Sequence, residues 1–132
     1  MRIQVKDFMS TPVITGVGED NVQDIKTVMK VKGINAIPIV SYSKDAQNDE
    51  MTIRGIVTAT DLSKDVNENT TLNDVMTTSS VHVVHVDSSA QSAAKMMLRH
   101  KVHHIVVMDE GEIKGMISSL DFVKLVAEYS LE

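Results

Sequence analysis

The sequence predicts a mixed α/β (α+β) fold, built from two β-α-β-β-α repeats that pack with pseudo-two-fold symmetry. Internal repetition is the first observation, since an offset of 68 residues places Val13 on Val81 and aligns the apolar residues that follow. The second is a doubled motif, "RGIVTATDL" at residues 54–62 and "KGMISSLDF" at residues 114–122. The third is size, because a repeat of about 60 residues buries little core alone and two packed together bury more.

The first repeat is expected to read strand, helix, strand, strand, helix. "VITGV" predicts a short extended segment. A helix follows in "EDNVQDIKTVMKVKG", where Val22, Ile25 and Met29 recur at helical spacing and Gly33 lies just past the end. "AIPIV" and "TIRGIV" are β-rich runs, and the polar "SYSKDAQNDEMT" between them predicts a loop. Asp61 begins a second, short helix.

The second repeat follows the same order. "VHVVHV", "HHIVVM" and "EIKGMI" predict strands, and a helix is expected from about Ser89 to Lys101. The last helix runs through "LDFVKLVAEY" and is apolar on most sides, so we expect it to be buried, against a partner. Five methionines are expected in the core: Met29, Met96, Met97, Met108 and Met116.

The composition predicts a cytoplasmic protein that binds neither nucleic acid nor membranes. The 132 residues carry a formal net charge of −5, whereas nucleic acids and anionic membranes attract a basic surface. No apolar run approaches the ~20 residues of a membrane span, and the N-terminal residues lack the apolar stretch of a signal peptide. With no cysteine, the sequence offers neither a disulfide framework nor a thiolate metal site.

The doubled motif places a hydroxyl and a carboxylate where a strand runs into a helix. The pairs are Thr58 with Asp61 and Ser118 with Asp121. A helix start offers unpaired N–H groups and positive potential that suit phosphate, while a carboxylate can accept hydrogen bonds from a ribose diol. Ser/Thr-x-x-Asp is also an ordinary N-capping arrangement. The motif is therefore open to both interpretations, although its duplication favours a nucleotide site.

Two long segments carry a family resemblance: "DFMSTPVITGVGEDNVQDIKTVMKVKGINAIPIV…RGIVTATDL" and "DVMTTSSVHVVHVDSSAQSAAKMMLRHKVHHIVVMDEGEIKGMISSLDF". Their order, spacing and duplication resemble a tandem pair of cystathionine-β-synthase (CBS) domains, a Bateman module, from about Val5 to Tyr129. The resemblance implies CBS repeats at residues 5–68 and 69–130. It also implies a regulatory homodimer that binds an adenosine compound in clefts between its repeats: AMP, ADP, ATP, S-adenosylmethionine, or sometimes NADH.

The resemblance also assigns site residues by position. Asp61 and Asp121 would hold ribose hydroxyls, Thr58 and Ser118 would lie near the phosphates, and Thr60 would offer a further hydroxyl. The residues expected near the base are Thr11, Val13, Ile14, Ile34, Asn35 and Ala36 in the first repeat, and Ser80, Val81, His82, Val102, His103 and His104 in the second.

Two adjacent histidines depart from the pattern of a similar repeat. "VHHIVVMDE…KGMISSLD" resembles the last repeat of the γ subunit of AMP-activated protein kinase, in which a His-Arg pair reaches phosphates. His103 takes the place of that histidine and His104 the place of the arginine. Because arginine is always charged and histidine only partly so near neutrality, polyphosphate binding is expected to be weaker and pH-dependent.

Other functions are less favoured by the sequence. A metal site is disfavoured because His103 and His104 would point to opposite faces of a strand. No nucleophile–base pair, P-loop or GxGxxG is visible, so a non-enzymatic module without an obligatory cofactor is expected, acting on a separate regulated protein. The alternative is a ligand-free dimerisation scaffold for a partner protein, favoured by the apolar helix from Leu120 to Tyr129. The terminal Leu131 and Glu132 are given no role.

Overall fold

A computed structural model of the chain describes residues 2–44, 49–63, 67–78 and 81–128. The fold is mixed α/β, as the sequence predicts. Two compact units are formed, one by the chain up to Val13 and from His82 onward, the other by Ile14–Val81. The compact units and the sequence repeats therefore divide the chain differently. The leading segment of the first repeat, up to Val13, belongs to the unit that holds most of the second repeat, and the leading segment of the second repeat, up to Val81, belongs to the unit that holds most of the first.

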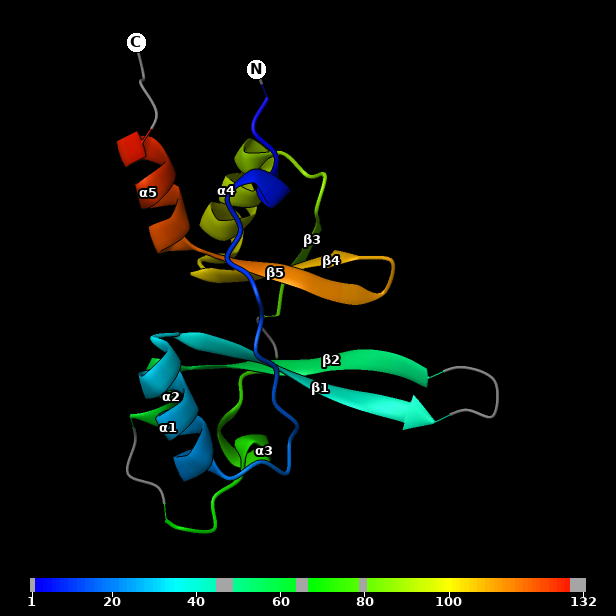
Figure 1. Ribbon diagram of the computed structural model, residues 1–132, viewed down its shortest axis with the longest axis vertical. Helices are drawn as coiled ribbons and strands as arrows, with labels where there is room; N and C mark the ends of the chain where they lie inside the picture. The colour runs from blue at the N-terminus through cyan, green and yellow to red at the C-terminus, as the bar shows by residue number, and fades with distance from the viewer. Residues whose placement is uncertain (1, 45–48, 64–66, 79–80, 129–132) are drawn as a thin grey trace. The chain divides into compact units, whose positions relative to one another are not determined.

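The unit Ile14–Val81 is built on an antiparallel hairpin with helices beside it (Figure 1). Its elements are α1 (Val22–Lys32), β1 (Ala36–Lys44), β2 (Asp49–Thr58), α2 (Ala59–Leu62) and α3 (Leu72–Val75). The hairpin register runs from Ala36 opposite Thr58 to Lys44 opposite Asp49, with an irregularity at Ile39 and Val40. The short second helix is confirmed, although it begins at Ala59 rather than at Asp61.

Helix α1 begins and ends where its sequence predicts. The Asn21 side-chain oxygen accepts hydrogen bonds from the backbone N–H groups of Gln23 (2.8 Å) and Asp24 (3.4 Å), an N-cap arrangement. At the other end Gly33 adopts a left-handed conformation with φ of 65°, which glycine enters without steric cost. Correct caps thus fix where the chain leaves α1 toward residues 34–36.

One expectation for this unit is confirmed only in part, and another is wrong. "VITGV" pairs with β1 only at Gly16, which forms a parallel bridge with Ile39, because the Val17 N–H donates to an Asp20 carboxylate oxygen (2.9 Å) and turns the chain away. The polar stretch predicted as a loop is largely strand, with Tyr42 opposite Met51. Backbone pairing extends the hairpin without burial, since Tyr42 is 61% exposed, and so no apolar alternation marks it. Residues 45–48 lie outside the described residues.

The other unit contains a three-stranded sheet in the order β3-β4-β5. Its elements are the 3-10 helix η1 (Val5–Asp7), β3 (Val83–His85), α4 (Ala90–His100), β4 (His104–Asp109), β5 (Glu112–Ser118) and α5 (Ser119–Glu128). Strands β3 and β4 run parallel, whereas β4 and β5 are antiparallel. Helices α4 and α5 lie on the same face of the sheet (Figure 1).

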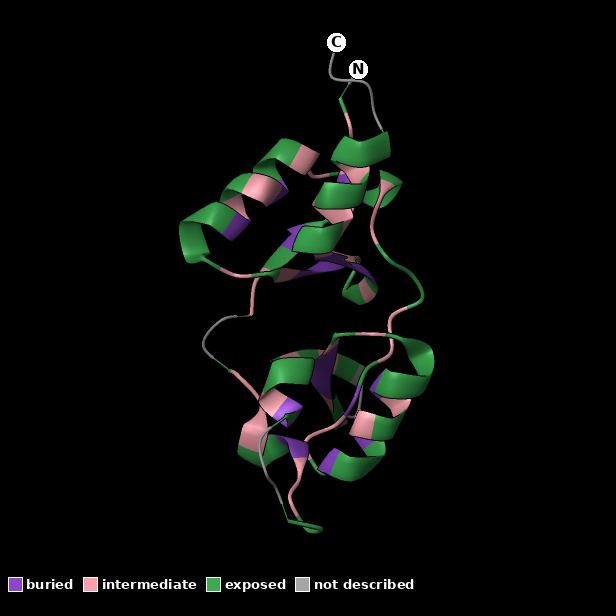
Figure 2. Cartoon of the chain, turned by 90° about the vertical axis from the view of Figure 1, so that its left-hand side faces the viewer, coloured by how far each residue is buried: buried purple, intermediate pink, exposed green. Residues whose placement is uncertain are grey.

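Each unit has its own hydrophobic core, and buried residues occupy the strands and the inner helix faces (Figure 2). The core of the unit Ile14–Val81 consists of Val22, Ile25, Met29, Ile37, Ile39, Val57, Leu62 and Leu72. The core of the other unit consists of Val5, Val84, Ala93, Met97, Ile105, Val107 and Ile117. Leu72 and Val5 belong to the leading segments, so each core requires residues from the other sequence repeat. The core placement of Met29, Met97 and Met116 is confirmed, and Met96 and Met108 are half-buried.

The expectation that the last helix is buried against a partner stays a prediction, because the structure describes a single chain. Helix α5 has no buried residue, and Leu120, Val123 and Val126 are 53%, 62% and 55% exposed. Phe122 packs on the core, edge to face with Phe8 at a ring-centroid distance of 5.1 Å. One side of α5 therefore suffices to anchor it, and the rest of its apolar surface faces outward. No helix within the described residues is long and apolar enough to cross a membrane.

Candidate functional site

The first helix-start corner is formed by Thr58 and Asp61 at the junction of β2 and α2. The Thr58 N–H donates to Oδ2 of Asp61 (3.0 Å), and the Asp61 N–H donates to Oγ1 of Thr58 (3.3 Å). This reciprocal pair is a capping box, so the N-capping interpretation of the motif is confirmed. Within the described residues, no donor reaches Oδ1 of Asp61, so the half-buried carboxylate keeps an acceptor oxygen for a ligand.

The second helix-start corner repeats this geometry at the junction of β5 and α5. The Ser118 N–H donates to Oδ2 of Asp121 (2.8 Å), and the Asp121 N–H donates to Oγ of Ser118 (3.3 Å). The Ser10 hydroxyl also lies 3.3 Å from each carboxylate oxygen of Asp121. Thr77 is the counterpart of Ser10, and among the described residues its side chain makes no hydrogen bond to Asp61, so the two corners differ in this contact.

The glycine of the doubled motif leaves room for a segment that passes over its strand, called the crossing segment below: residues 74–77 at Gly55 and residues 7–10 at Gly115. Ser10 and Met116 exchange two backbone hydrogen bonds (2.8 and 3.1 Å), and Thr77 and Ile56 exchange two at 3.0 Å. A Cβ on Gly55 would lie 2.7 Å from the Thr77 carbonyl oxygen, and one on Gly115 would lie 2.6 Å from the Met9 sulfur. Each glycine therefore permits the close approach of the segment that leads into the other repeat.

His103 and His104 lie beside the second corner. Strand β4 begins at His104, which is opposite Ser118, while the His103 carbonyl accepts a hydrogen bond from the Ser119 N–H (3.0 Å). Burial lowers the pKa of His104 from its ordinary value of 6.5, the nearby His103 lowers it further, and Asp121 opposes the shift. His104 is therefore mainly neutral at pH 7, and can donate or accept one hydrogen bond rather than supply a full charge.

Two of the residues expected near the base, Asn35 and Ala36, lie at the first corner. Ala36 is opposite Thr58 in the hairpin, and the Asn35 carbonyl accepts a hydrogen bond from the Ala59 N–H (2.9 Å). Ile34 and Ile14 pack against the core of the same unit. Thr60 is exposed, and Thr11 and Val13 belong to the other compact unit.

The expected base contacts of the second repeat are more dispersed. Val102 packs against the core, and the His82 ring stacks on His100 with a centroid distance of 4.2 Å. His85 is exposed and its Nε2 lies 3.0 Å from Oδ1 of Asp109. Ser80 lies outside the described residues. Within the part of the chain that the structure describes, no group of three or more His, Asp or Glu side chains could hold a metal ion.

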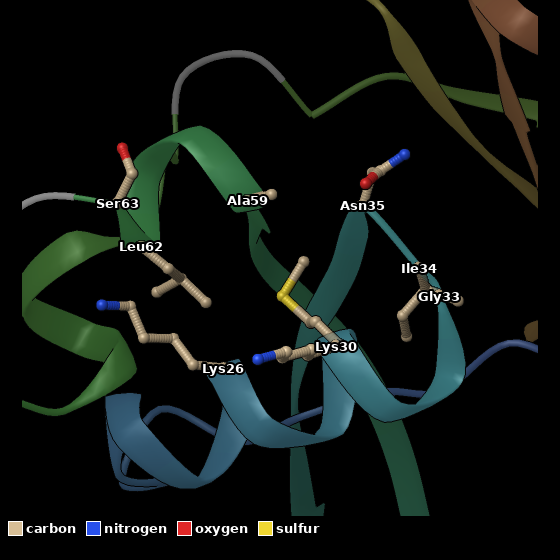
Figure 3. A pocket seen from close by; sticks show the side chains of 9 residues that line it. Lys26, Lys30, Gly33, Ile34, Asn35, Ala59, Leu62 and Ser63 are labelled. Atoms are coloured by element: carbon tan, nitrogen blue, oxygen red, sulfur yellow. The ribbon is translucent and has the colours of Figure 1, made fainter.

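A cavity of about 350 Å³ adjoins the first corner, between α1 and α2 (Figure 3). Of the predicted residues, Ile34 and Asn35 line it, whereas Thr58 and Asp61 do not. The other lining residues are Lys26, Met29, Lys30, Gly33, Ala59, Leu62 and Ser63. The volume falls within the range of about 300–1,000 Å³ that ligand pockets occupy.

Sequence reasoning missed Ser10, Lys26 and Lys30. Ser10 reaches Asp121 across 111 residues, although its match with Thr77 in "DFMS" and "DVMT" places it in a repeated segment. Lys26 and Lys30 are four residues apart on α1, a spacing that puts both on one helix face. That signal is weak without the cavity, because exposed lysines on a helix are common.

Comparison with known proteins identifies the family of this chain. The family described as CBS domain matches residues 5–68 and again residues 72–128. The chain therefore belongs to the CBS domain family and contains a tandem pair of these domains.

Solved structures of similar size share the fold. One is a putative acetoin utilization protein, AcuB, from Vibrio cholerae, at 27% identity and a TM-score of 0.75 over 96% of this chain and 92% of that one. Another is the CBS domain pair of protein MJ0100 in complex with 5′-methylthioadenosine and S-adenosyl-L-methionine. It is 26% identical, with a TM-score of 0.74 over 92% of this chain and 98% of that one.

Curated relatives are longer proteins. A homoserine O-acetyltransferase from Methanosalsum zhilinae is 29% identical over 96% of this chain and 25% of its own length. An inosine-5′-monophosphate dehydrogenase from Korarchaeum cryptofilum is 29% identical over 89% of this chain and 23% of its own length. The chain thus spans about a quarter of the length of these relatives.

Proposed function

We propose that this CBS domain pair is a non-enzymatic regulatory module that binds an adenosine compound (AMP, ADP, ATP or S-adenosylmethionine) through its two helix-start corners. The observation that carries the proposal is the paired geometry of Asp61 and Asp121. Each carboxylate is held by a capping box at a helix start, and each has lone pairs beyond those that the cap uses. The binding of adenosine compounds by the similar MJ0100 domain pair supports this choice of ligand.

The ligand would be held by its ribose and by its charged or polar tail. A vicinal diol can donate two hydrogen bonds to one carboxylate, and charge-assisted bonds of this kind are stronger than neutral ones. At the second corner, the ten-residue helix α5 adds positive potential at its start, while His103 and His104 offer donors beside it. The expectation that the ligand lies between the two repeats stays a prediction, as do the homodimer, the regulated partner and the cytoplasmic location.

The test is a thermal-shift panel with AMP, ADP, ATP, S-adenosylmethionine and NADH. A ligand at 100 times its dissociation constant adds about 2.7 kcal/mol to stability, which raises the midpoint by roughly several degrees. Asp61→Asn and Asp121→Asn should each reduce this ligand-induced shift, because an amide accepts ribose hydroxyls less well than a carboxylate.

The matched control is Asp74→Asn, which alters a capping box outside both corners. The Thr71 N–H donates to Oδ2 of Asp74 at 3.1 Å, as the motif residues do in theirs. All three variants should lose about 0.3–1 kcal/mol of stability, because each removes a negative charge from a helix start while its amide oxygen can still accept the capping hydrogen bond. Only the Asp61 and Asp121 variants should lose ligand stabilisation, measured against each variant's own ligand-free midpoint. An equal loss in Asp74→Asn would contradict the proposal, and no shift with any compound would favour the ligand-free scaffold.

A further inference from the structure

We propose that the cavity between α1 and α2 binds the phosphate groups of a nucleoside phosphate through Lys26 and Lys30. The inference rests on the proposed function and deepens it by naming the ligand class. A phosphorylated adenosine compound would bind this unit better than a neutral adenosine thioether.

The cavity carries two cations, Lys26 and Lys30, on one face of α1. Lys26 and Lys30 both line it from α1, and Figure 3 shows their side chains extending from that helix with Leu62 of α2 facing them across the cavity. Among the described residues, neither lysine has a carboxylate oxygen within 4.0 Å, whereas Lys6 and Lys114 form ion pairs at 2.8 and 2.7 Å. In a chain of net charge −5, two cations that line one cavity mark a place where an anion can bind.

The rest of the cavity suits a ligand with an apolar body. Met29 and Leu62 are 5% and 2% exposed and form its inner wall together with the half-buried Ile34. Asn35 and Ser63 also line the cavity, and the Ser63 hydroxyl donates to the Thr60 carbonyl (2.7 Å). The Asn35 carbonyl is bonded to the Ala59 N–H (2.9 Å), which joins the α1 side of the cavity to the α2 side and to the first helix-start corner. Apolar walls with a few polar and charged groups are typical of cofactor and nucleotide pockets.

The internal repeat shows that this cation pair belongs to one unit. The same offset of 68 residues places Ala94 and Leu98 of α4 on Lys26 and Lys30. Leu98 is 80% exposed, so an apolar side chain occupies the surface that the Lys30 ammonium occupies in α1. The unit Ile14–Val81 therefore offers lysines to a phosphate, whereas the other unit offers His103 and His104.

Calorimetric titration of wild type and of Lys26→Gln, Lys30→Gln and the double variant tests the proposal, with ATP, AMP and 5′-methylthioadenosine as probes. Removing one charge-assisted hydrogen bond to phosphate should weaken ATP binding roughly tenfold. Binding of 5′-methylthioadenosine, which has no phosphate, should be unchanged. Lys32→Gln is the matched control, because Lys32 is exposed on the same helix and does not line the cavity. It should alter ATP affinity by less than about twofold.

Two results would overturn the proposal while leaving the proposed function intact. One is ATP affinity that is unchanged in the double variant. The other is an equal loss in Lys32→Gln, which would reveal general electrostatics. Inorganic tripolyphosphate separates the two claims: if no adenosine compound binds wild type, the proposed function fails, and lysine-dependent tripolyphosphate binding would still support the cavity as a phosphate site. Tripolyphosphate binding that does not depend on the lysines would overturn the cavity as well. Circular dichroism verifies that each variant is folded.

Discussion

Carboxylate capping recurs in this chain and is not by itself a functional signature. Asp74 accepts the Thr71 N–H at 3.1 Å, and Asp7 accepts the Gln4 N–H at 2.8 Å, each three residues after its partner. Asp61 and Asp121 differ from these in their surroundings. Each follows a strand that contains the motif glycine, and Asp121 also accepts a hydrogen bond from the Ser10 hydroxyl. At the residue scale, the surroundings of the cap therefore separate a candidate ligand group from an ordinary helix start.

His104 should make the free energy of unfolding depend on pH. Burial, with His103 beside it, lowers the pKa of His104 below 6.5 in the folded chain, so the unfolded chain takes up a proton more readily. Stability should therefore fall as the pH is lowered through about 6.5 toward the folded-state pKa. Denaturant melts between pH 8 and pH 5 should show a steeper loss in wild type than in His104→Gln.

His103→Gln provides the second arm of this test. It removes the neighbouring charge but keeps the burial, so it should weaken the pH dependence of unfolding without abolishing it. Identical pH profiles for wild type and His104→Gln would contradict the assignment of this dependence to His104.

At the scale of secondary structure elements, the motif glycines are needed because the crossing segments pack directly against them. Residues 7–10 and 74–77 pack on β5 and β2 respectively, in the space that a side chain at Gly115 or Gly55 would fill. At Gly55 the obstacle is a backbone oxygen at 2.7 Å, whereas at Gly115 the nearest atoms belong to the flexible Met9 side chain. The first position should tolerate a methyl group less well than the second.

Gly55→Ala should destabilise the chain by about 1–3 kcal/mol, and Gly115→Ala by less, because the Met9 side chain can move aside whereas the hydrogen-bonded backbone of Thr77 cannot. Urea denaturation of both variants measures the difference. Gly111→Ala is a control for backbone strain without steric overlap, because a Cβ there meets nothing within 4 Å, whereas the residue has φ of 77°. Equal stabilities of Gly55→Ala and wild type would show that the crossing segment is not held against β2.

The elements that the sequence predicted correctly are those with strong local signals. Asn21 and Gly33 mark the ends of α1, and the apolar β4 and β5 strands are buried at Ile105 and Ile117. The hairpin extension around Tyr42 was missed because exposed strands are held by backbone bonds that leave no apolar pattern. The composition of α5 shows that the helix is apolar, but not which of its faces pack within the chain and which stay available to a partner.

The residues of the candidate site also fall into those that local sequence signals predict and those that depend on tertiary packing. Asp61, Asp121 and their capping hydroxyls follow from spacing along the chain, since a helix start fixes what lies three residues apart. Ser10 could not be placed from spacing, because its contact with Asp121 depends on the crossing segment. The lysines of the cavity needed the position of α2 beside α1, which depends on tertiary packing.

At the scale of the whole molecule, the chain is a tandem pair of CBS domains whose compact units each contain residues from both sequence repeats. Val5 is fully buried in the unit that holds β3 to β5, and Leu72 is fully buried in the unit that holds β1 and β2. Neither sequence repeat therefore contains a complete core. A ligand that stabilises one unit would therefore also stabilise the packing of a segment encoded in the other repeat.

The most direct test of the account is a titration of the isotope-labelled protein with ATP and 5′-methylthioadenosine, followed by the backbone amide resonances. If adenosine compounds bind at the helix-start corners, the amides of Asp61 and Asp121 should shift with saturable dependence on ligand, while the matched amide of Asp74 should not. Unchanged resonances at both corners, or shifts as large at Asp74, would contradict the central claim that these carboxylates bind an adenosine ligand.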